Sequence, residues 1–462
     1  MRGLLLGLAV ACYLIAVLFL RPAPTPGPAM RDFEAYYAAG ATWRQGRNAY
    51  GEAIWSAERR IPGVDPARVD VLPYINPPLL LPIMALLSLA PYATATVLWG
   101  SLLGFALLLL ALESLGLARL VRDPPTILAA LVLALAFGPL SSDLALGQLA
   151  LIAVAATVLA TAAFHRSHAG TSAVGAVIAA LQPTLAVPML AWVRSRRALH
   201  LLLAGAIAFL LFWTILAATS NAPTLVTYLA LVRAHAAAEG LALIQFSPAA
   251  IAAGFGLANT PARILGAAVA LLALATWLLL ARRLGKDTIG AFALGCAFVP
   301  FIVSFVHEHD FTLLLPALII ALARAHDLKR RSLVLSAAVL IGVDWLGLAQ
   351  RPDGVLQSLF LVCALLAATL ALVPVKDHAK IFIAPLALIG LLVVAGAIAQ
   401  HHPAPIWPDA MHSFHLASNA SIASRWHAEQ RACGMFAVDP FFAILRCGPL
   451  LGCALLALAI AL

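Results

Sequence analysis

Long runs of leucine, alanine, valine and isoleucine recur along nearly the whole chain and constrain its fold more than any other feature. Hydrophobic residues make up 63% of the sequence and charged residues only 11%, whereas a soluble domain is roughly 45–50% apolar. The runs do not show the short alternating segments of an outer-membrane barrel. We therefore predict an all-α fold, a polytopic transmembrane helical bundle of about 12 to 14 spans, each close to the ~20 residues of a bilayer crossing.

The positions of the runs give the expected spans. Residues 3–20 are kept as the first span, because the sequence after them has no clear small-residue cleavage site. Residues 169–195 are either one kinked helix or two short ones that turn at Gln182-Pro183, since proline removes a backbone donor and clashes with the preceding turn. The other expected spans are 94–116, 125–140, 147–164, 198–219, 263–282, 287–306, 309–325, 331–348, 356–374, 381–400 and 446–462.

Clusters of arginine and lysine between the runs set the expected orientation. The positive-inside rule accounts for them, and for the formal charge of +9, without a nucleic-acid partner. If all the clusters face the cytoplasm, the N-terminus is cytoplasmic, the chain turns at Gln182-Pro183, and residues 76–91 lie along the outer surface without crossing. If residues 76–91 cross and 169–195 form one helix, three arginines are misplaced: Arg119, Arg122 and Arg166.

Three segments then fall on the outer side, and they contain most of the polar residues. They are a long first loop, a loop at 220–261 and a late loop at 401–445. We divide the chain into a module at 1–325, with outer loop 21–93, and additional helices at 326–462.

The six cysteines include no CxxC pair and predict no zinc site. Cys433 and Cys447 either form a disulfide on an oxidising outer side or remain two unlinked thiols.

Two acids, Asp32 and Glu34, follow the proline-rich segment RPAPTPGPAM in the first outer loop. The residues DFEAYYAAGATWRQG predict a short helix with Asp32 at its N-cap. In one interpretation Asp32 only caps the helix and Glu34 only complements its dipole, contributions of about 0.5–2 and 0.3–1 kcal/mol. Tyr36, Tyr37 and Trp43 are typical of the membrane interface, where a lipid headgroup lies, and favour a functional role for Asp32.

Several motifs carry a resemblance to a known family. Those of the first outer loop are Asp32-Phe33-Glu34, Tyr36-Tyr37, Ala39-Gly40 and Tyr74-Ile75-Asn76-Pro77-Pro78. The later ones are Gly147-Gln148, Ala169-Gly170 with Gln182-Pro183, and SFVHEHD at 304–310. With these motifs the chain resembles the GT-C type glycosyltransferases, and more narrowly the polyprenyl-phosphate-mannose-dependent and related arabinofuranose-dependent membrane transferases. The resemblance covers residues 1–325, and Gln182 stands where the family has lysine.

The resemblance implies transfer of a sugar from a polyprenyl-phosphate donor to a hydroxyl of a glycolipid, glycan or protein. The site would face outward from the bacterial inner (plasma) membrane. Asp32 matches the catalytic aspartate, a general base for an inverting single displacement, which needs no covalent intermediate. His307 would bind the donor phosphate as an imidazolium, and Asp310, three residues later on one helix face, would orient its ring.

The remaining expected substrate-binding residues share a polar or aromatic side chain near these motifs: Glu34, Tyr36, Tyr37, Arg59, Arg60, Tyr74, Asn76, Gln148, Gln182, His309 and Asp310. Arg233, His235 and Glu239 could line the acceptor side. A metal held by residues 307–310 is the weaker interpretation, because adjacent residues point in different directions around a helix. No motif demands a cofactor, although the sequence leaves room for a divalent cation.

Two other classes of function compete with the enzyme. A lipid or sugar transporter or flippase also needs many helices, but such proteins usually contain structural repeats, and none is visible here. A non-catalytic scaffold is the third interpretation, if glutamine at position 182 marks lost activity.

Overall fold

The computed structural model describes residues 1–20, 28–64, 72–194, 196–345, 348, 354–373, 383–399 and 421–462. Within these residues the chain forms helices and no strand, which confirms the all-α prediction. The Lys376–Lys380 part of the basic clusters and much of the late outer loop, residues 401–420, lie outside the described residues.

The helices in chain order are α1 (Arg2–Leu18), α2 (Arg31–Arg44), α3 (Ala53–Glu58), η1 (Pro78–Leu80), α4 (Leu81–Leu87), α5 (Tyr92–Leu117), α6 (Pro124–Leu135), α7 (Gly138–Leu146), α8 (Ala150–His165), α9 (Ala169–Ala179), α10 (Pro183–Ala186), η2 (Val187–Arg194), α11 (Arg196–Thr219), α12 (Leu225–Glu239), α13 (Pro248–Gly254), α14 (Asn259–Arg283), α15 (Thr288–Ile302), η3 (Glu308–Leu313), α16 (Leu314–Arg324), α17 (Leu328–Gly342), α19 (Gly354–Leu372), α20 (Ile383–Ala399), α21 (Ile422–Ala432) and α22 (Pro440–Ala461).

Five of these helices are long and apolar enough to cross a membrane: α5, α11, α14, α19 and α22. The pair α6 and α7, bent by 74°, would make a sixth span. The protein is therefore a multi-pass membrane protein, although fewer described helices meet the length criterion than the 12 to 14 spans expected. Breaks shorten the others, as where the expected span 125–140 bends before Gly138-Pro139.

Two ambiguous segments of the sequence have short, broken helices. Helix α9 ends at Ala179 and α10 begins at Pro183 with Gln182 as its N-cap, so residues 169–195 form separate pieces. The segment Pro78–Leu87 is a short apolar helix packed against α2. Its length of roughly 15 Å falls well short of a hydrocarbon core of about 30 Å, as expected for a segment that does not cross.

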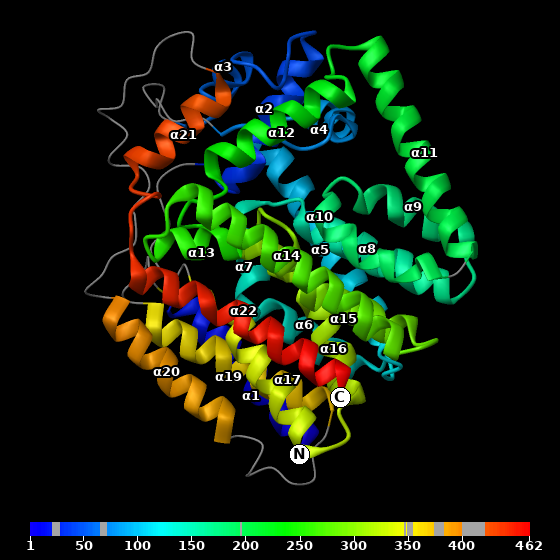
Figure 1. Cartoon of the computed structure of the whole chain (residues 1–462), viewed down its shortest axis with the longest axis vertical. Coiled ribbons are helices and arrows are strands. Elements are labelled where there is room, and N and C mark those ends of the chain that lie inside the picture. Colours follow the sequence, from blue (N-terminus) through cyan, green and yellow to red (C-terminus); the bar gives the residue numbers. More distant parts are fainter. Residues whose placement is uncertain are drawn as a thin grey trace.

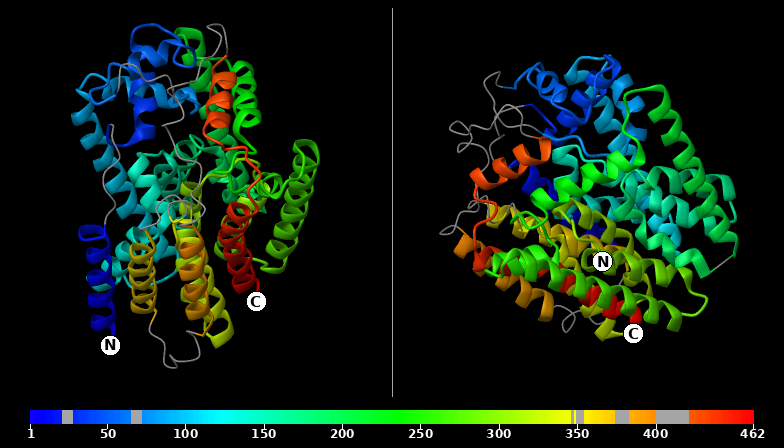
Figure 2. Two further views of the ribbon diagram at one scale, coloured as in Figure 1. Left: turned by 90° about the vertical axis from the view of Figure 1, so that its left-hand side faces the viewer. Right: turned by 45° about the horizontal axis from the view of Figure 1, so that its top comes forward.

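The polar segments and the chain termini occupy opposite ends of the molecule. Both termini lie at one end, whereas α2, α3, α4, α12 and α21 gather at the other (Figure 1). The turned view on the left of Figure 2 shows the same separation. The three segments predicted to lie on one side of the membrane therefore do lie together.

The basic clusters also lie together, through ion pairs between helix ends. Glu113, near the end of α5, accepts from Arg122 at 3.4 Å and from Arg166 at 2.8 Å. This acid has a structural role, because it joins the ends of α5 and α8. The other contacts that join these segments are Arg2 with Asp123, Thr288 with His165, Arg324 with Asp287 and Arg330 with the C-terminal Leu462.

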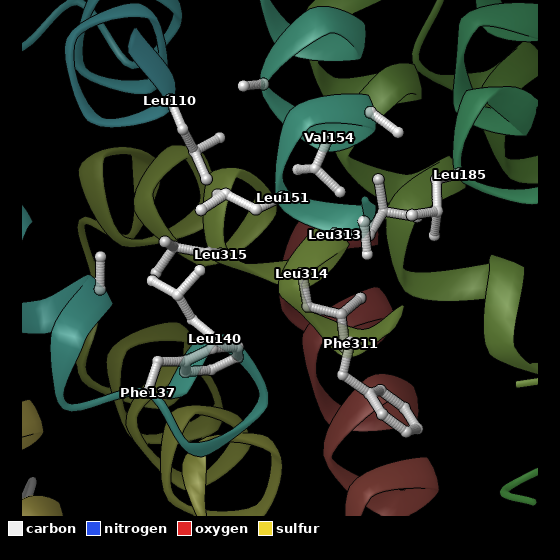
Figure 3. Close-up of a cluster of buried hydrophobic side chains, with 14 of the residues drawn as sticks. Leu110, Phe137, Leu140, Leu151, Val154, Leu185, Phe311, Leu313, Leu314 and Leu315 are labelled. Atoms are coloured by element: carbon white, nitrogen blue, oxygen red, sulfur yellow. The ribbon is translucent and has the colours of Figure 1, made fainter. Parts of the chain in front are cut away.

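An apolar cluster fixes the start of α16 and the short helix η3 before it. Leu313, Leu314 and Leu315 are almost completely buried. They pack among side chains from α5, α7, α8 and α10 (Figure 3), which include Leu110, Leu140, Leu151, Val154 and Leu185. Because protein cores are close-packed, this cluster holds the polar residues 307–310 in a fixed position.

Helices α2 and α4 touch at a glycine. A Cβ atom on Gly40 would collide with the backbone carbonyl group of Met84 and would lie 2.6 Å from the backbone nitrogen of Ala85. Backbone atoms cannot move aside as a flexible side chain can, so only glycine permits this approach.

We expect Gly40→Ala to lower the thermal unfolding midpoint of the detergent-solubilised protein, because overpacking costs typically about 1–3 kcal/mol. Gly104→Ala on α5 is the matched control, since nothing lies within 4 Å of the position that a Cβ would occupy there. Alanine at that position should be neutral or stabilise by about 0.5–1 kcal/mol, the helix cost of glycine. Equal midpoints for the two variants would contradict the close approach.

Candidate active site

Helix α2 begins two residues earlier than the sequence predicts. Its N-cap is Met30, which has a left-handed backbone (φ 58°), and no side chain caps the helix. The hydroxyl of Tyr92 donates to the carbonyls of Ala29 (2.6 Å) and Met30 (3.2 Å) and secures this start. The prediction that Asp32 caps the helix is therefore wrong, and its carboxylate is free to bond elsewhere.

Asp32 belongs to a three-residue hydrogen-bond chain. The Nε2 amide of Gln148 donates to Oδ2 of Asp32. The hydroxyl of Tyr36 donates to Oε1 of Gln148 at 2.6 Å. Because the tyrosine occupies the amide oxygen, Gln148 presents its NH2 group to the carboxylate. Tyr36 is buried, whereas Asp32 is partly exposed.

The backbone conformation and close packing of Gly147 explain the Gly147-Gln148 motif. Gly147 ends α7 with φ 70°, and its carbonyl accepts from Nε1 of Trp99 at 2.8 Å. A Cβ atom there would lie 2.8 Å from Cβ of Met30 and 2.9 Å from Cβ of Phe33. Glycine is required both by the left-handed conformation and by the approach of α2, and it places Gln148 beside Asp32.

His307 lies between α15 and η3, and Asp310 does not orient its imidazole as expected. Oδ2 of Asp310 accepts from the backbone N–H of His307 at 2.8 Å, and Oδ1 accepts from Nε2 of Gln182 at 2.9 Å. The His307 ring instead has Nε2 at 2.7 Å from Oε1 of Glu239. The prediction assumed a helix through residue 307, but η3 begins at Glu308, so the ring leaves the backbone in another direction.

His309 stacks on His307, with ring centroids 5.1 Å apart and an interplanar angle of 14°. Burial, and next the charge of His307, hold the pKa of His309 well below its usual range, so His309 is neutral. Ligating atoms of His307, His309 and Asp310 lie within 4.8 Å of one another. Since Asp310 and Nε2 of His307 already bond to protein groups, this arrangement favours substrate binding over a metal site.

Asp32 and His307, far apart in the sequence, lie within electrostatic range of each other. Burial raises the pKa of Asp32 to about 6, although the charge of Arg31, the Gln148 hydrogen bond and the charge of His307 all lower it. Burial would lower the pKa of His307, but the charge and hydrogen bond of Glu239, with the charges of Asp310 and Asp32, raise it overall. Each group therefore influences the pKa of the other, which places a carboxylate and an imidazole in one candidate site.

Aromatic residues of the first loop form a wall beside this site. The Tyr74 ring lies edge-on to Tyr36 (6.3 Å between centroids) and 5.0 Å from that of Tyr50. The Tyr50 hydroxyl donates to the backbone carbonyl of Asn76 at 2.7 Å. Tyr37 points elsewhere, because its hydroxyl donates to the carbonyl of Ala90 at 2.9 Å.

The other expected residues of the first loop lie apart from this hydrogen-bond chain. Glu34 is fully buried, and residues two positions apart on a helix face different ways, so it points away from Asp32. Arg59 and Arg60 are exposed just after α3. Their roles in substrate binding stay predictions.

Of the two alternatives for Cys433 and Cys447, the structure does not contain the disulfide. Cys433 is buried, and Cys447 is exposed on α22. The interpretation as two unlinked thiols holds.

Sequence reasoning missed the residues around His307. Glu239 and His235 were expected on the acceptor side, and Gln245 and Trp426 were not singled out. An acid at the end of an outer helix in a chain so poor in charge was the available signal for Glu239. Trp426 stands in the polar stretch SRWHAEQR, where one large aromatic residue indicates a buried face.

The fold and this acid–histidine pair define a multi-pass membrane protein with a polar site at one end. A model of glycosyltransferase family 87 matches residues 74–305, half of the chain. The chain belongs to glycosyltransferase family 87, a GT-C-like membrane family. No curated protein and no solved structure matches it. The matched region includes Gln148, Gln182 and Glu239. Asp32 lies well before its start at residue 74, and His307 follows closely after its end at residue 305.

We expect Gly147→Ala to destabilise the protein more than Gly46→Ala. Both glycines have positive φ (70° and 68°), and alanine in that conformation costs about 1–2 kcal/mol. Nothing lies within 4 Å of a Cβ on Gly46, so only Gly147→Ala adds a clash with α2. Thermal unfolding of both variants in one detergent measures the difference, and equal midpoints would contradict the packing of Gly147 against α2.

Proposed function

We propose that this glycosyltransferase moves a sugar from a polyprenyl-phosphate donor to a hydroxyl of a glycolipid, glycan or protein. The reaction would take place at the outer face of the bacterial plasma membrane, as an inverting single displacement. The observation that carries the proposal is that Asp32 bonds to Gln148, which follows α7, and that α7 packs against η3, the helix that begins just after His307. Asp32 and His307 each influence the pKa of the other. A base and a cation at one site are what transfer from a lipid phosphate needs.

A protein side chain would serve each step of the sugar transfer. Asp32 accepts the proton of the acceptor hydroxyl while its oxygen attacks the anomeric carbon of the sugar. The bond between that carbon and the donor phosphate oxygen breaks, and the electron pair leaves with the polyprenyl phosphate. A protonated His307 offsets the negative charge on this leaving group. A base with a pKa of about 6 is well matched to catalysis near neutral pH.

The remaining groups would bind the substrates. Tyr36 and Tyr74 would surround the sugar, since aromatic rings suit a membrane interface. Tyr37, whose hydroxyl is bonded to the Ala90 carbonyl, would offer only its ring to the lipid headgroup. Gln148 would hold Asp32 in place, and Gln182 would hold Asp310 beside His307. Further contacts to donor or acceptor are proposed for four residues: Arg59, Arg60, Asn76 and His309. Glu34 is fully buried and is not proposed as a direct contact.

We expect Asp32→Asn to reduce sugar transfer by about 10²–10⁴-fold, the usual contribution of a positioned base. Purified protein would be incubated with radiolabelled polyprenyl-phosphate sugars and membrane lipids, and labelled product would be counted. Asp327→Asn is the control: Asp327 caps α17, a role that asparagine fills equally well, and its surface ion pair with Arg330 (3.2 Å) lies on the same helix end. Unchanged transfer in Asp32→Asn would reject the role of Asp32, and movement of labelled sugar without bond formation would support transport instead.

The rate of transfer should fall as the pH drops through about 6, because only ionised Asp32 can accept a proton. Gln148→Leu removes a hydrogen bond that lowers the pKa of Asp32. The acid limb of the pH profile should therefore move to higher pH in this variant. Rates measured from about pH 4.5 to 8.5 test the shift, and an acid limb unchanged by Gln148→Leu would contradict the assignment of that limb to Asp32.

A further inference from the structure

Glu239 is a carboxylate with four side-chain donors, although it is only 2% exposed. Its Oε1 atom lies 2.7 Å from Nε2 of His307 and 2.9 Å from Nε2 of Gln245. Its Oε2 atom lies 3.1 Å from Nε2 of His235 and 2.6 Å from Nε1 of Trp426. A buried carboxylate is costly unless it is paired and hydrogen-bonded. This arrangement satisfies both oxygens, so Glu239 is built to remain ionised.

The geometry fixes the state of the His307 ring. Gln245 accepts from the backbone N–H of Val306 at 2.9 Å through Oε1, which turns its NH2 group toward Glu239. An ionised carboxylate can only accept, so Nε2 of His307 must carry a proton toward it. Nδ1 lies on the other side of the ring, toward the backbone N–H of Asp310 in the capping box that starts η3. The side chain is 23% exposed, so part of the ring is within reach of a ligand.

We propose that Glu239 is a positioning residue, which holds Nε2–H of His307 inward and favours a positively charged ring beside the donor phosphate. The assignment of a phosphate to His307 rests on the proposed function. The ring orientation and its charge rest on the contacts of Glu239 alone.

The charges around His307 agree with this role. Among the described residues, the titratable groups that act on it are Glu239 from α12, Asp310 and His309 from η3, and Asp32 from α2. Burial opposes a charged ring, and Glu239 makes the largest opposing contribution to the pKa of His307. Burial would raise the pKa of Glu239 itself, but His307 and His235 together hold it well below the usual range.

Helix α21 holds the end of α12 that carries Glu239. Trp426 reaches Glu239 directly, and Nδ1 of the next residue, His427, lies 2.8 Å from the carbonyl of Ala238. The guanidinium of Arg425 lies 4.2 Å from the ring centroid of Trp55 on α3. In Figure 1, α21 lies beside α3 and α12. The C-terminal segment, which lies beyond the family match, therefore supports the histidine of the site.

The charge of the ring can be measured without any substrate. Full-length protein with ¹³Cε1-labelled histidine would be titrated by NMR in nanodiscs, and the signal lost in His307→Gln assigns His307. We expect its midpoint above 6.5 in the wild type and about 1–3 pH units lower in Glu239→Gln, the usual effect of removing a close opposite charge. Asp287→Asn is the control, because Asp287 pairs with Arg324 at the opposite end and should leave His307 unchanged.

A second variant keeps the test decisive if Glu239→Gln does not fold. Glu239→Asp keeps the negative charge, but the side chain is one methylene group shorter, so the carboxylate lies farther from Nε2 of His307. The midpoint of His307 should then lie between those of the wild type and the glutamine variant. A midpoint equal to that of the wild type in either variant overturns the proposal, whatever happens to thermal stability.

Binding of undecaprenyl phosphate, which carries no sugar, tests the ligand. At about pH 7.5 its Kd should rise about tenfold or more in Glu239→Gln, because one pKa unit corresponds to a factor of ten. A lower His307 midpoint with unchanged Kd would reject phosphate binding at His307. The proposed function is tested separately, because it fails if Asp32→Asn retains transfer activity. The NMR midpoint of His307 tests the role of Glu239 without reference to activity.

Discussion

The cost of placing charge in an apolar environment determines where this protein keeps its ionisable groups. In a chain that is 63% hydrophobic, an isolated buried charge costs several kcal/mol. The arginines join helix ends in ion pairs at the end with the termini, as Arg166 does with Glu113. Two carboxylates of the candidate site each have a donor, as Asp32 has Gln148 and Glu239 has His307. A carboxylate with built-in donors at the polar end indicates a function.

The site depends on breaks in helices. Gly147 ends α7 and brings Gln148 to α2. Gln182 lies in the break between α9 and α10, as the N-cap of α10, and its amide donates to Asp310. Continuous helices would expose these amides to lipid or bury them without partners. The breaks turn them inward, where apolar packing below η3 keeps them in place. Glutamine at 182, which in the sequence could mark lost activity, here has a defined hydrogen bond.

Local sequence patterns predicted the elements of this structure but not the partners across it. Apolar runs predicted the bounds of most helices to within a few residues, and proline predicted the break at Gln182-Pro183. Both effects are local in the sequence. The N-cap assigned to Asp32 was wrong because the helix starts two residues earlier. Asp310 was assigned to the imidazole by helical spacing, and the true partner, Glu239, comes from another helix. Trp426 is more distant still, and no periodicity relates it to His307.

Two carboxylates face the same histidine, and their environments separate their roles. Glu239 has four donors and a pKa well below the usual range, so it cannot take a proton near neutral pH. Asp32 has one amide donor and a pKa of about 6, so it can. Groups whose environments drive their pKa values apart commonly divide acid, base and electrostatic roles. The structure therefore favours Asp32 as the base and leaves Glu239 the task of keeping His307 charged.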